Sequence, residues 1–246
     1  MKLRRTIILV IALAVCATLS GVLLAAPPSF IGTITGDMTL NVPADFGDIQ
    51  AALNYLDDKR IAGNAIVTIQ VADGTYNYTS TIEVKHSEGG RIQILGNVSN
   101  PNNCLLSFSG CTQGFLIQNG NKIGLIDGFK LYGNGTVQEG VYITRGSYAK
   151  CGANLIVDSF ERGIFVHYNS YAMVASTAIN NSYAGIAAEY DSSIYAMYST
   201  ATGNNRGFWA NRCSTINAVG VVLSGNTTNF SPSANSDGNI NSYIRN

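Results

Sequence analysis

The chain has 246 residues, of which 46% are hydrophobic and only 12% are charged, and its formal net charge is zero. This neutrality excludes the basic face on which nucleic-acid binding normally depends, so we expect no nucleic-acid partner. The low charge and high apolar content also exclude a disordered chain, and the length allows one sizeable domain.

The N-terminal residues 1–26 are predicted to be a targeting segment. Residues 1–5 are basic, and residues 6–26 form an uncharged, mostly apolar run of 21 residues. This pattern fits a cleaved signal peptide, but the run is also long enough to remain as a membrane anchor. In both cases we expect an exported protein, secreted or at the cell surface, whose only membrane contact would be residues 6–26 if they are not cleaved.

Residues 27–64 are predicted to hold a linker, an edge strand at 37–42 and the main helix of the chain. The helix is expected over Asp48–Asp57, because Asp48 is a suitable N-cap and Ile49, Leu53 and Leu56 fall on one helical face. The first coil of a solenoid exposes an apolar core and unpaired strand edges. We therefore expect this helix to cap that coil.

Residues 65–228 consist of short alternating segments separated by polar turns. A glycine-led pattern repeats at Gly140, Gly163, Gly185 and Gly207, at intervals of 23, 22 and 22 residues. The residues one and three positions after each glycine are apolar, which indicates strands, and a repeat of this length indicates a solenoid. We predict an all-β, parallel β-helix of about seven coils. It should be right-handed, as crossover connections between parallel strands nearly always are. Residues 229–246 leave the pattern and are expected to form a C-terminal cap.

Two groups of residues carry a resemblance to a known superfamily. Residues 41–56 and the strand and turn of residues 67–76, which end in Asp-Gly-Thr-Tyr, resemble the beginning of pectin-lyase-like right-handed β-helices. The glycine-led repeats, with residues 201–204 and 239–244, resemble β-helical regions of phage and prophage tail proteins and of surface proteins. The resemblance implies polysaccharide binding or cleavage, or a structural role in tail fibres and surface rods. A homotrimer is one assembly that it allows.

The catalytic motifs of the characterised branches of that superfamily do not support a particular enzyme. The Asn-Thr-Asp and Gly-His-Gly motifs of polygalacturonases and the Gln-Asp-Thr motif of pectin methylesterases do not occur, and no segment matches the calcium ligands of pectate lyases. Tailspike-type depolymerases place their carboxylates differently, so a lyase or glycoside hydrolase activity stays open.

The cysteines and histidines do not indicate a metal site. No CxxC pair and no histidine-rich spacing occurs, and we expect no cofactor. Cys104 and Cys111 lie close in sequence, and export would permit a disulfide between them. Cys151 falls at an inward strand position and is expected to be a buried free thiol.

Stacking the coils at the glycine register gathers polar and aromatic side chains on one lateral face, for which we predict polysaccharide binding. Exposed rings beside polar groups suit a sugar chain, since rings stack on the apolar sugar faces while polar groups bind hydroxyls. The predicted substrate-binding residues are Tyr142, Phe165 and Trp209, expected to point outward, together with Arg145, Arg212 and Tyr168. The predicted catalytic residues are Glu189, Asp191, His167 and Tyr190.

The sequence leaves two chemistries and one non-catalytic alternative open. Glu189 and Asp191, about 6.5–7 Å apart along one strand, would be an acid and a base near the lower limit for an inverting glycosidase. Alternatively, His167 and Tyr190 would abstract a proton from a uronic acid whose carboxylate is neutralised by Arg145 or Arg212. In the third interpretation these are turn residues and stacking ladders. The protein is then a structural or adhesin-like component that acts through protein–protein contacts.

Overall fold

The structure is a computed structural model, and it describes residues 32–232 and 243–245, which belong to one compact unit. The expected targeting segment, the first residues of the linker and most of the expected C-terminal cap lie outside the described residues. Within the described ranges, no helix is both long and apolar enough to cross a membrane.

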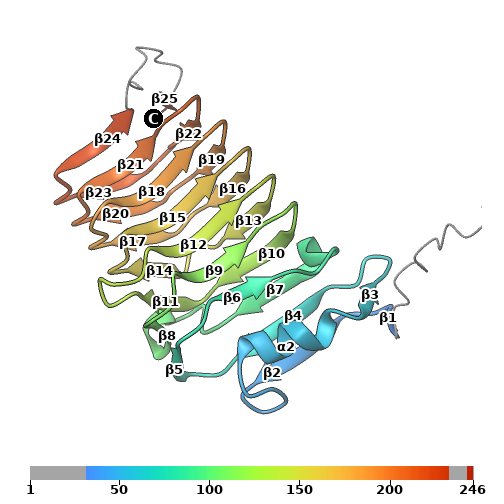
Figure 1. Ribbon diagram of the computed structural model, residues 1–246. Coiled ribbons are helices and arrows are strands. Elements are labelled where there is room, and N and C mark those ends of the chain that lie inside the picture. Colours follow the sequence, from blue (N-terminus) through green and yellow to red (C-terminus); the bar gives the residue numbers. More distant parts are fainter. Residues whose placement is uncertain (1–31, 233–242, 246) are drawn as a thin grey trace, which may run out of the picture. The chain divides into compact units, whose positions relative to one another are not determined.

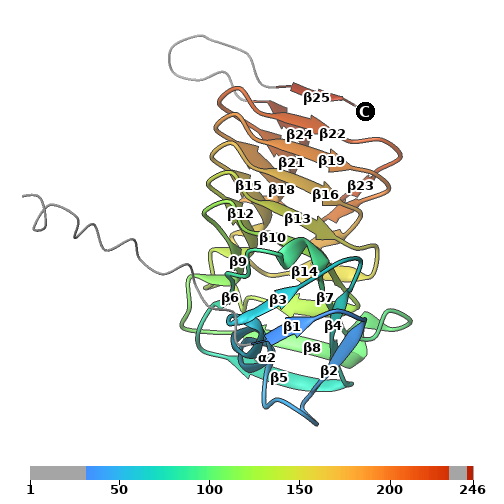
Figure 2. The same ribbon diagram turned by 90° about the vertical axis from the view of Figure 1, so that its right-hand side faces the viewer.

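The chain winds as a right-handed parallel β-solenoid in which each turn contributes one strand to each of three sheets (Figure 1). We call the nine-stranded sheet sheet I and the two seven-stranded sheets, in chain order, sheets II and III. Seven complete turns are therefore extended by one strand of sheet I at each end. The result is about eight turns, one more than the sequence predicted. Figure 2 shows the strands of sheet I stacked one above the other.

The strands of each sheet follow in stacking order. Sheet I contains β2 (Met38–Val42), β4 (Val67–Val71), β7 (Ile92–Leu95), β10 (Lys122–Asp127), β13 (Tyr148–Cys151), β16 (Tyr171–Val174), β19 (Ser193–Ala196), β22 (Thr215–Asn217) and β25 (Tyr243–Arg245). Sheet II contains β5 (Gly74–Tyr78), β8 (Cys104–Phe108), β11 (Phe129–Tyr132), β14 (Leu155–Asp158), β17 (Thr177–Ile179), β20 (Thr200–Thr202) and β23 (Val222–Ser224). Sheet III contains β6 (Ile82–Val84), β9 (Gln113–Ile117), β12 (Glu139–Thr144), β15 (Arg162–His167), β18 (Ala184–Glu189), β21 (Arg206–Ala210) and β24 (Thr228–Pro232).

The predicted helix forms as α2 (Ile49–Leu56) and packs against β2, β4 and β6 at the first turn (Figure 1). Its N-cap is Asp48, whose carboxylate accepts a hydrogen bond from the Ala51 backbone N–H at 2.7 Å. The apolar helix face joins the main core, so the helix covers apolar surface at the start of the stack. The remaining short elements are the strand pair β1 (Gly32–Ile34) and β3 (Lys59–Ile61) and the 3₁₀ helices η1 (Gly89–Arg91) and η2 (Pro101–Asn103).

The interior of the coils is an apolar core built by strand alternation. The residues one and three positions after each repeated glycine all point inward, as predicted, and phenylalanines are among the largest fully buried side chains. Those inward residues, each with no exposed surface, are Val141, Ile143, Ile164, Val166, Ile186, Ala188, Phe208 and Ala210. Cys151 is also buried, as expected, whereas Cys104 and Cys111 are free thiols, so the disulfide that the sequence permits is not formed.

The repeated glycines are required by the close approach of successive turns. A Cβ atom at Gly140 would lie 2.6 Å from the carbonyl oxygen of Gly163, and one at Gly163 would lie 2.5 Å from that of Gly185. Both distances are well inside the 3.0 Å limit that real Cβ atoms respect. The glycine spacing therefore records the length of one turn.

Buried asparagines form a ladder at the corner between sheets II and III. The backbone N–H and the side-chain amide of Asn181 both donate to Asn204 Oδ1 at 2.9 Å. The amide of Asn204 in turn donates to Asn226 Oδ1 and to the carbonyl of Ala178, each at 3.0 Å. These side chains satisfy backbone groups that the turn would otherwise leave buried and unpaired. The polar turns of the sequence are thus partly structural.

We expect Gly163→Ala to lower the free energy of unfolding by about 1–3 kcal/mol, because the added methyl group overpacks against backbone. Gly36→Ala is the matched control, since a Cβ at Gly36 meets no atom within 4 Å. Chemical denaturation of the two variants measures the difference. Equal effects of the two substitutions would contradict the close approach.

Candidate functional site

The lateral rows predicted from the glycine spacing are present on sheet III. Tyr142 pairs with Phe165, Phe165 with Ala187, and Ala187 with Trp209, on successive strands. His167 pairs with Thr144 on one side and with Glu189 on the other. The side chains that the sequence assigned to one face therefore do lie in register.

Two rings of the aromatic row, those of Phe165 and Trp209, are buried, which corrects the expectation that all of its rings are open to a ligand. Phe165 is 4% exposed and Trp209 is 6% exposed, and with Ala187 they form a small apolar cluster separate from the main core. The guanidinium of Arg162 lies 4.7 Å above the Phe165 ring, and the Tyr183 ring lies 5.1 Å from that of Trp209. These rings point away from the coil interior but are covered by neighbouring side chains, so they stabilise the sheet and cannot stack on a sugar.

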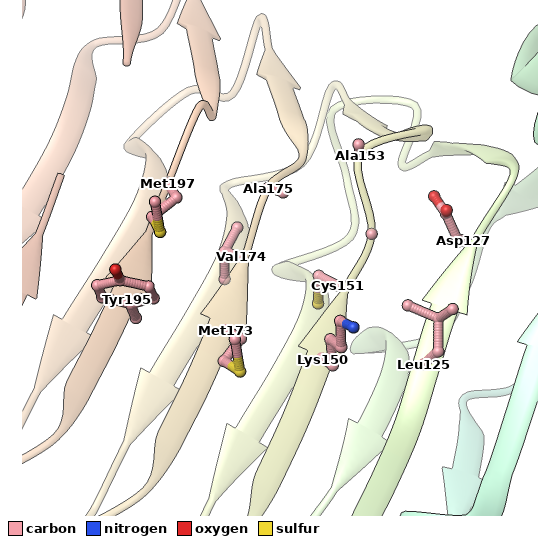
Figure 3. Close-up of a pocket in the computed structure, with 11 residues that line it drawn as sticks. Leu125, Asp127, Lys150, Cys151, Ala153, Met173, Val174, Ala175, Tyr195 and Met197 are labelled. Atoms are coloured by element: carbon pink, nitrogen blue, oxygen red, sulfur yellow. The ribbon is translucent and has the colours of Figure 1, made fainter. Parts of the chain in front are cut away.

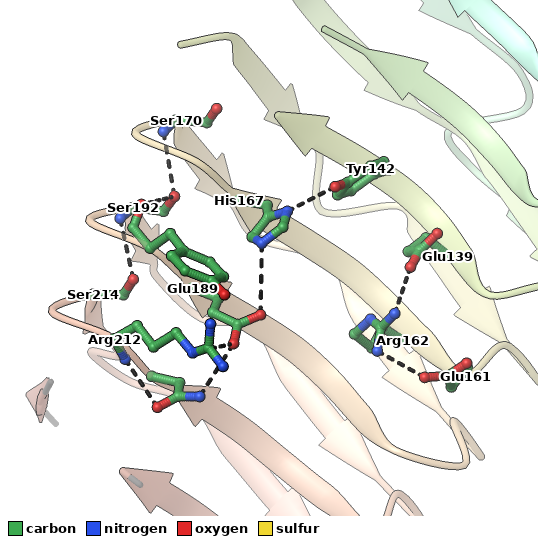
Figure 4. A network of polar contacts seen from close by, with 12 residues as sticks. Glu139, Tyr142, Glu161, Arg162, His167, Ser170, Glu189, Ser192, Arg212 and Ser214 are labelled. Carbon is green, nitrogen blue, oxygen red and sulfur yellow. Dashed lines mark hydrogen bonds and ion pairs between the residues drawn. The ribbon is translucent and has the colours of Figure 1, made fainter. Parts of the chain in front are cut away.

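A polar network occupies the end of the same face (Figure 4). The hydroxyl of Tyr142 lies 2.7 Å from His167 Nδ1, and Oε2 of Glu189 lies 3.7 Å from His167 Nε2. Glu189 is held on its other side by Arg212, 3.3 Å away, and by the amide of Asn211, at 3.2 Å. Tyrosine, histidine and glutamate from three successive turns therefore lie in one line, in which the Tyr142–His167 contact is a hydrogen bond and the His167–Glu189 contact is not.

A second part of the network compensates the charge of Arg162. Its guanidinium forms ion pairs of 2.7 Å with both Glu139 and Glu161 (Figure 4). Gln113, one turn before Glu139, donates to the other oxygen of that carboxylate at 3.2 Å. The charge of Arg162 is thus compensated by carboxylates of this chain.

The two parts of the network meet in a cleft of about 290 Å³. The cleft is mainly polar, and its one apolar wall is the edge of the aromatic row. Its lining consists of Gln113, Gln138, Glu139, Tyr142, Arg162, Phe165, His167 and Glu189.

The electrostatic environment keeps His167 neutral. Burial, assisted by the nearby guanidinium groups of Arg162 and Arg212, lowers the pKa of His167 from 6.5 to about 4. Burial also raises the pKa of Glu189, against the opposing effect of Arg212. We assign the tautomer in which Tyr142 donates to Nδ1, which leaves the N–H on Nε2, on the side of Glu189.

The turn that follows β18 (Ala184–Glu189) separates Glu189 from Asp191, which the sequence placed on one strand. β18 ends at Glu189, and both Tyr190 and Asp191 have left-handed backbones, with φ of 54° and 56°. Asp191 is exposed beyond this turn. The premise that Glu189 and Asp191 lie along one strand is therefore wrong, and of the two only Glu189 lines the cleft.

The remaining predicted residues gather at the same corner, between sheets III and I. Tyr168 is 46% exposed, and its ring lies 4.7 Å from that of Tyr190 and 3.9 Å from that of His167. The guanidinium of Arg212 lies 4.3 Å above the Tyr190 ring. Arg145 is exposed and reaches Gln118 at 3.5 Å. Accessible aromatic surface thus adjoins the cleft, although not at the positions where the sequence placed most of it.

A second hollow, of about 310 Å³, lies on the outer face of sheet I (Figure 3). Its lining is mostly apolar, with Leu125, Met173 and Met197 as its large aliphatic side chains. The carboxylate of Asp127, at its edge, accepts a hydrogen bond from the backbone N–H of Asn154 at 2.7 Å. The glycine-led pattern predicts side-chain rows on sheet III only. This hollow lies on sheet I, where Lys150, Met173 and Tyr195 form an outward row.

In the described part of the chain, no group of three or more His, Cys, Asp or Glu side chains could hold a metal ion. Comparison with known proteins adds no identification. None of the protein-family models matches this chain, and the searches of curated proteins and of solved structures gave no significant match. The class that the structure defines is a parallel β-solenoid with a polar cleft on one lateral face.

We expect the imidazole of His167 to titrate near pH 4 when followed by NMR. Between pH 6.5 and about 4 the unfolded chain binds a proton at this residue and the folded chain does not, so this residue's contribution to stability is lost as the pH falls through that range. The loss is about 3 kcal/mol. Because the raised pKa of Glu189 acts in the opposite direction, the comparison of His167→Asn with its parent belongs in a Glu189→Gln background. A midpoint near 6.5 would contradict the burial of this ring.

Proposed function

We propose that this chain is an exported β-helix protein that binds polysaccharide at the corner between sheets III and I. The observation that carries the proposal is the polar cleft bordered by the exposed ring of Tyr168 and the half-buried ring of Tyr190. His167 lines the cleft, and the rings of Tyr168 and Tyr190 lie 3.9 Å and 5.0 Å from its ring. A sugar unit offers matching surfaces, because its apolar face stacks on a ring while its hydroxyl groups bind amides, carboxylates and phenols.

The charges around the cleft favour a sugar unit without an acidic group in the cleft itself. Arg162 is paired with two carboxylates, and Arg212 is paired with Glu189. A uronate carboxylate would have to displace one of these pairs. Of the two arginines proposed from the sequence to neutralise such a group, Arg212 is paired with Glu189 and Arg145 does not line the cleft, so the cleft is better suited to hydroxyl groups.

Cleavage of the bound polysaccharide is the more specific proposal, and the geometry favours His167 of the predicted catalytic residues, with Tyr142 rather than Tyr190 as its hydrogen-bond partner. The carboxylates that line the cleft, Glu139 and Glu189, stand two turns and five residues apart in the register, which corresponds to about 19 Å between Cα atoms. Glycosidase carboxyl groups lie about 5–9.5 Å apart. Proton transfer in the cleft would therefore fall to Tyr142 and His167, with Glu189 balancing the charge.

The proposals for the cellular location of the protein and for its superfamily rest on the sequence. Residues 1–26 carry the proposal of export, and the turn of residues 73–76 carries the resemblance to pectin-lyase-like and tail-type β-helices. The position of α2 on the first turn agrees with that resemblance without identifying a family.

A structural or adhesin-like rod is the second candidate function. The observation that favours it is the burial of Phe165 and Trp209, which turns much of the aromatic row into packing. In this case the protein acts through protein–protein contacts, and the homotrimer stays a prediction that analytical ultracentrifugation would test. A stable trimer without affinity for any glycan would select this function.

Removing a tyrosine ring at this corner tests glycan binding, because neither ring belongs to the main core. We expect Tyr168→Gly and Tyr190→Gly each to weaken binding to the best ligand of a neutral and acidic glycan panel by about tenfold, which corresponds to about 1.4 kcal/mol. Glycine is chosen because both positions have positive φ, at 47° and 54°. Isothermal titration calorimetry measures the affinity.

Tyr198→Gly is the matched control, because Tyr198 has the same backbone conformation, with φ of 54°, is 70% exposed and lies at the corner between sheets I and II. This substitution should leave the affinity unchanged. Equal losses in all three variants, or no ligand in the panel, would rule out binding at the proposed corner.

A further inference from the structure

One arginine on sheet III lacks the partners that its counterpart in the repeat has. Glu139, Arg162, Ala184 and Arg206 occupy equivalent positions on successive strands. Arg162 and Arg206 therefore stand in one row, two turns apart. This repetition makes each arginine a control for the other.

Arg162 is surrounded by carboxylates on two sides. Glu139 lies one turn before it in the row, Glu161 precedes it in the chain, and each forms an ion pair of 2.7 Å with its guanidinium. The positive charge is thus neutralised within the protein.

Arg206 has neutral residues at both of these positions. Ala184 lies one turn before it in the row, and Asn205 precedes it in the chain. Within the described residues no carboxylate lies within ion-pair distance of Arg206, and its buried Nη1 has no hydrogen-bond partner. Its guanidinium lies instead 4.5 Å above the ring of Tyr183, which fixes the side chain against the sheet.

A half-buried guanidinium with an unpaired N–H is costly, because that group has lost its water without gaining an acceptor. Its planar fork of donors matches the oxygens of a carboxylate, sulfate or phosphate group. We propose that Arg206, held by Tyr183, is a binding site for one such oxyanion, which takes the place that Glu139 and Glu161 fill around Arg162. The site rests on its own contacts and does not depend on glycan binding in the cleft.

The oxyanion can come from two sources, a free inorganic ion or an acidic substituent on a sugar chain. Both offer the same oxygens to the guanidinium. If the source is a sugar chain, the ligand of this face carries its acidic group near β21, about 10 Å along the stack from the charge-compensated Arg162.

The only tryptophan of the chain reports on this site, since Trp209 contacts Tyr183 at 5.1 Å between ring centroids and Tyr183 contacts Arg206. We expect sodium sulfate to change the fluorescence of the full chain saturably at millimolar concentration, whereas sodium chloride of equal ionic strength does not. A sulfated oligosaccharide and its unsulfated parent form the second arm. Calorimetry on the same solutions provides a readout independent of the fluorophore.

Two variants identify the residue responsible. Arg206→Gln removes the charge, and Asn205→Glu supplies a carboxylate where Arg162 has Glu161, so that the site is closed while Arg206 is kept. Both should weaken oxyanion binding at least tenfold, whereas Arg60→Gln, which removes an exposed arginine paired with Glu88 away from this face, should not. Because Asn205 is exposed, its substitution should leave the fold intact.

The possible results distinguish an oxyanion site at Arg206 from its absence. Binding of inorganic sulfate, or of the sulfated oligosaccharide alone, that is lost in Asn205→Glu supports the site, and the difference between the two arms names the source. Absence of saturable binding in both arms, or equal binding by wild type and Asn205→Glu, overturns it. Failure of the neutral oligosaccharide to bind would count against the cleft and leave this site standing.

Discussion

The constraint on which the structure depends is the distance between one turn of the solenoid and the next. At Gly140 and Gly163 the backbones come so close that no side chain fits between the glycine and the carbonyl group of the next turn. Successive turns that start at these glycines are 22 or 23 residues long. A nearly constant turn length places side chains of equivalent positions in vertical rows, and the candidate binding residues on sheet III belong to such rows.

Rows of identical residues and rows with an exception have different consequences. The asparagine ladder through Asn181 and Asn204 repeats because each member satisfies the backbone of the adjoining turn, and such a row is structural. In other rows the residue type changes from turn to turn, and the titratable and charged side chains lie in these rows. His167 and Glu189 replace a threonine in one row, and Arg206 stands without the carboxylates that Arg162 has in another. The exceptions are thus the places where binding is best sought.

The fold could be predicted from the sequence because glycine spacing and strand alternation are local signals of the turn length. The rows of sheet III followed from the same spacing. What could not be predicted is how neighbouring rows cover one another. Phe165 was expected to be exposed, but Arg162 from an adjacent row lies over it. Asp191 was misplaced for a different reason, because two consecutive left-handed residues end the strand at Glu189 and no glycine marks that turn.

The central claim is that residues one turn apart lie side by side in the stated register. NMR measurement of nuclear Overhauser contacts from the methyl group of Ala187 tests it directly, because this methyl group belongs to the cluster between Phe165 on one turn and Trp209 on another. The account predicts contacts from Ala187 to both rings. Contacts from Ala188 to those rings instead, or contacts of Ala187 with the inward residues Ile164 and Phe208, would show a register shifted by one residue and would contradict it.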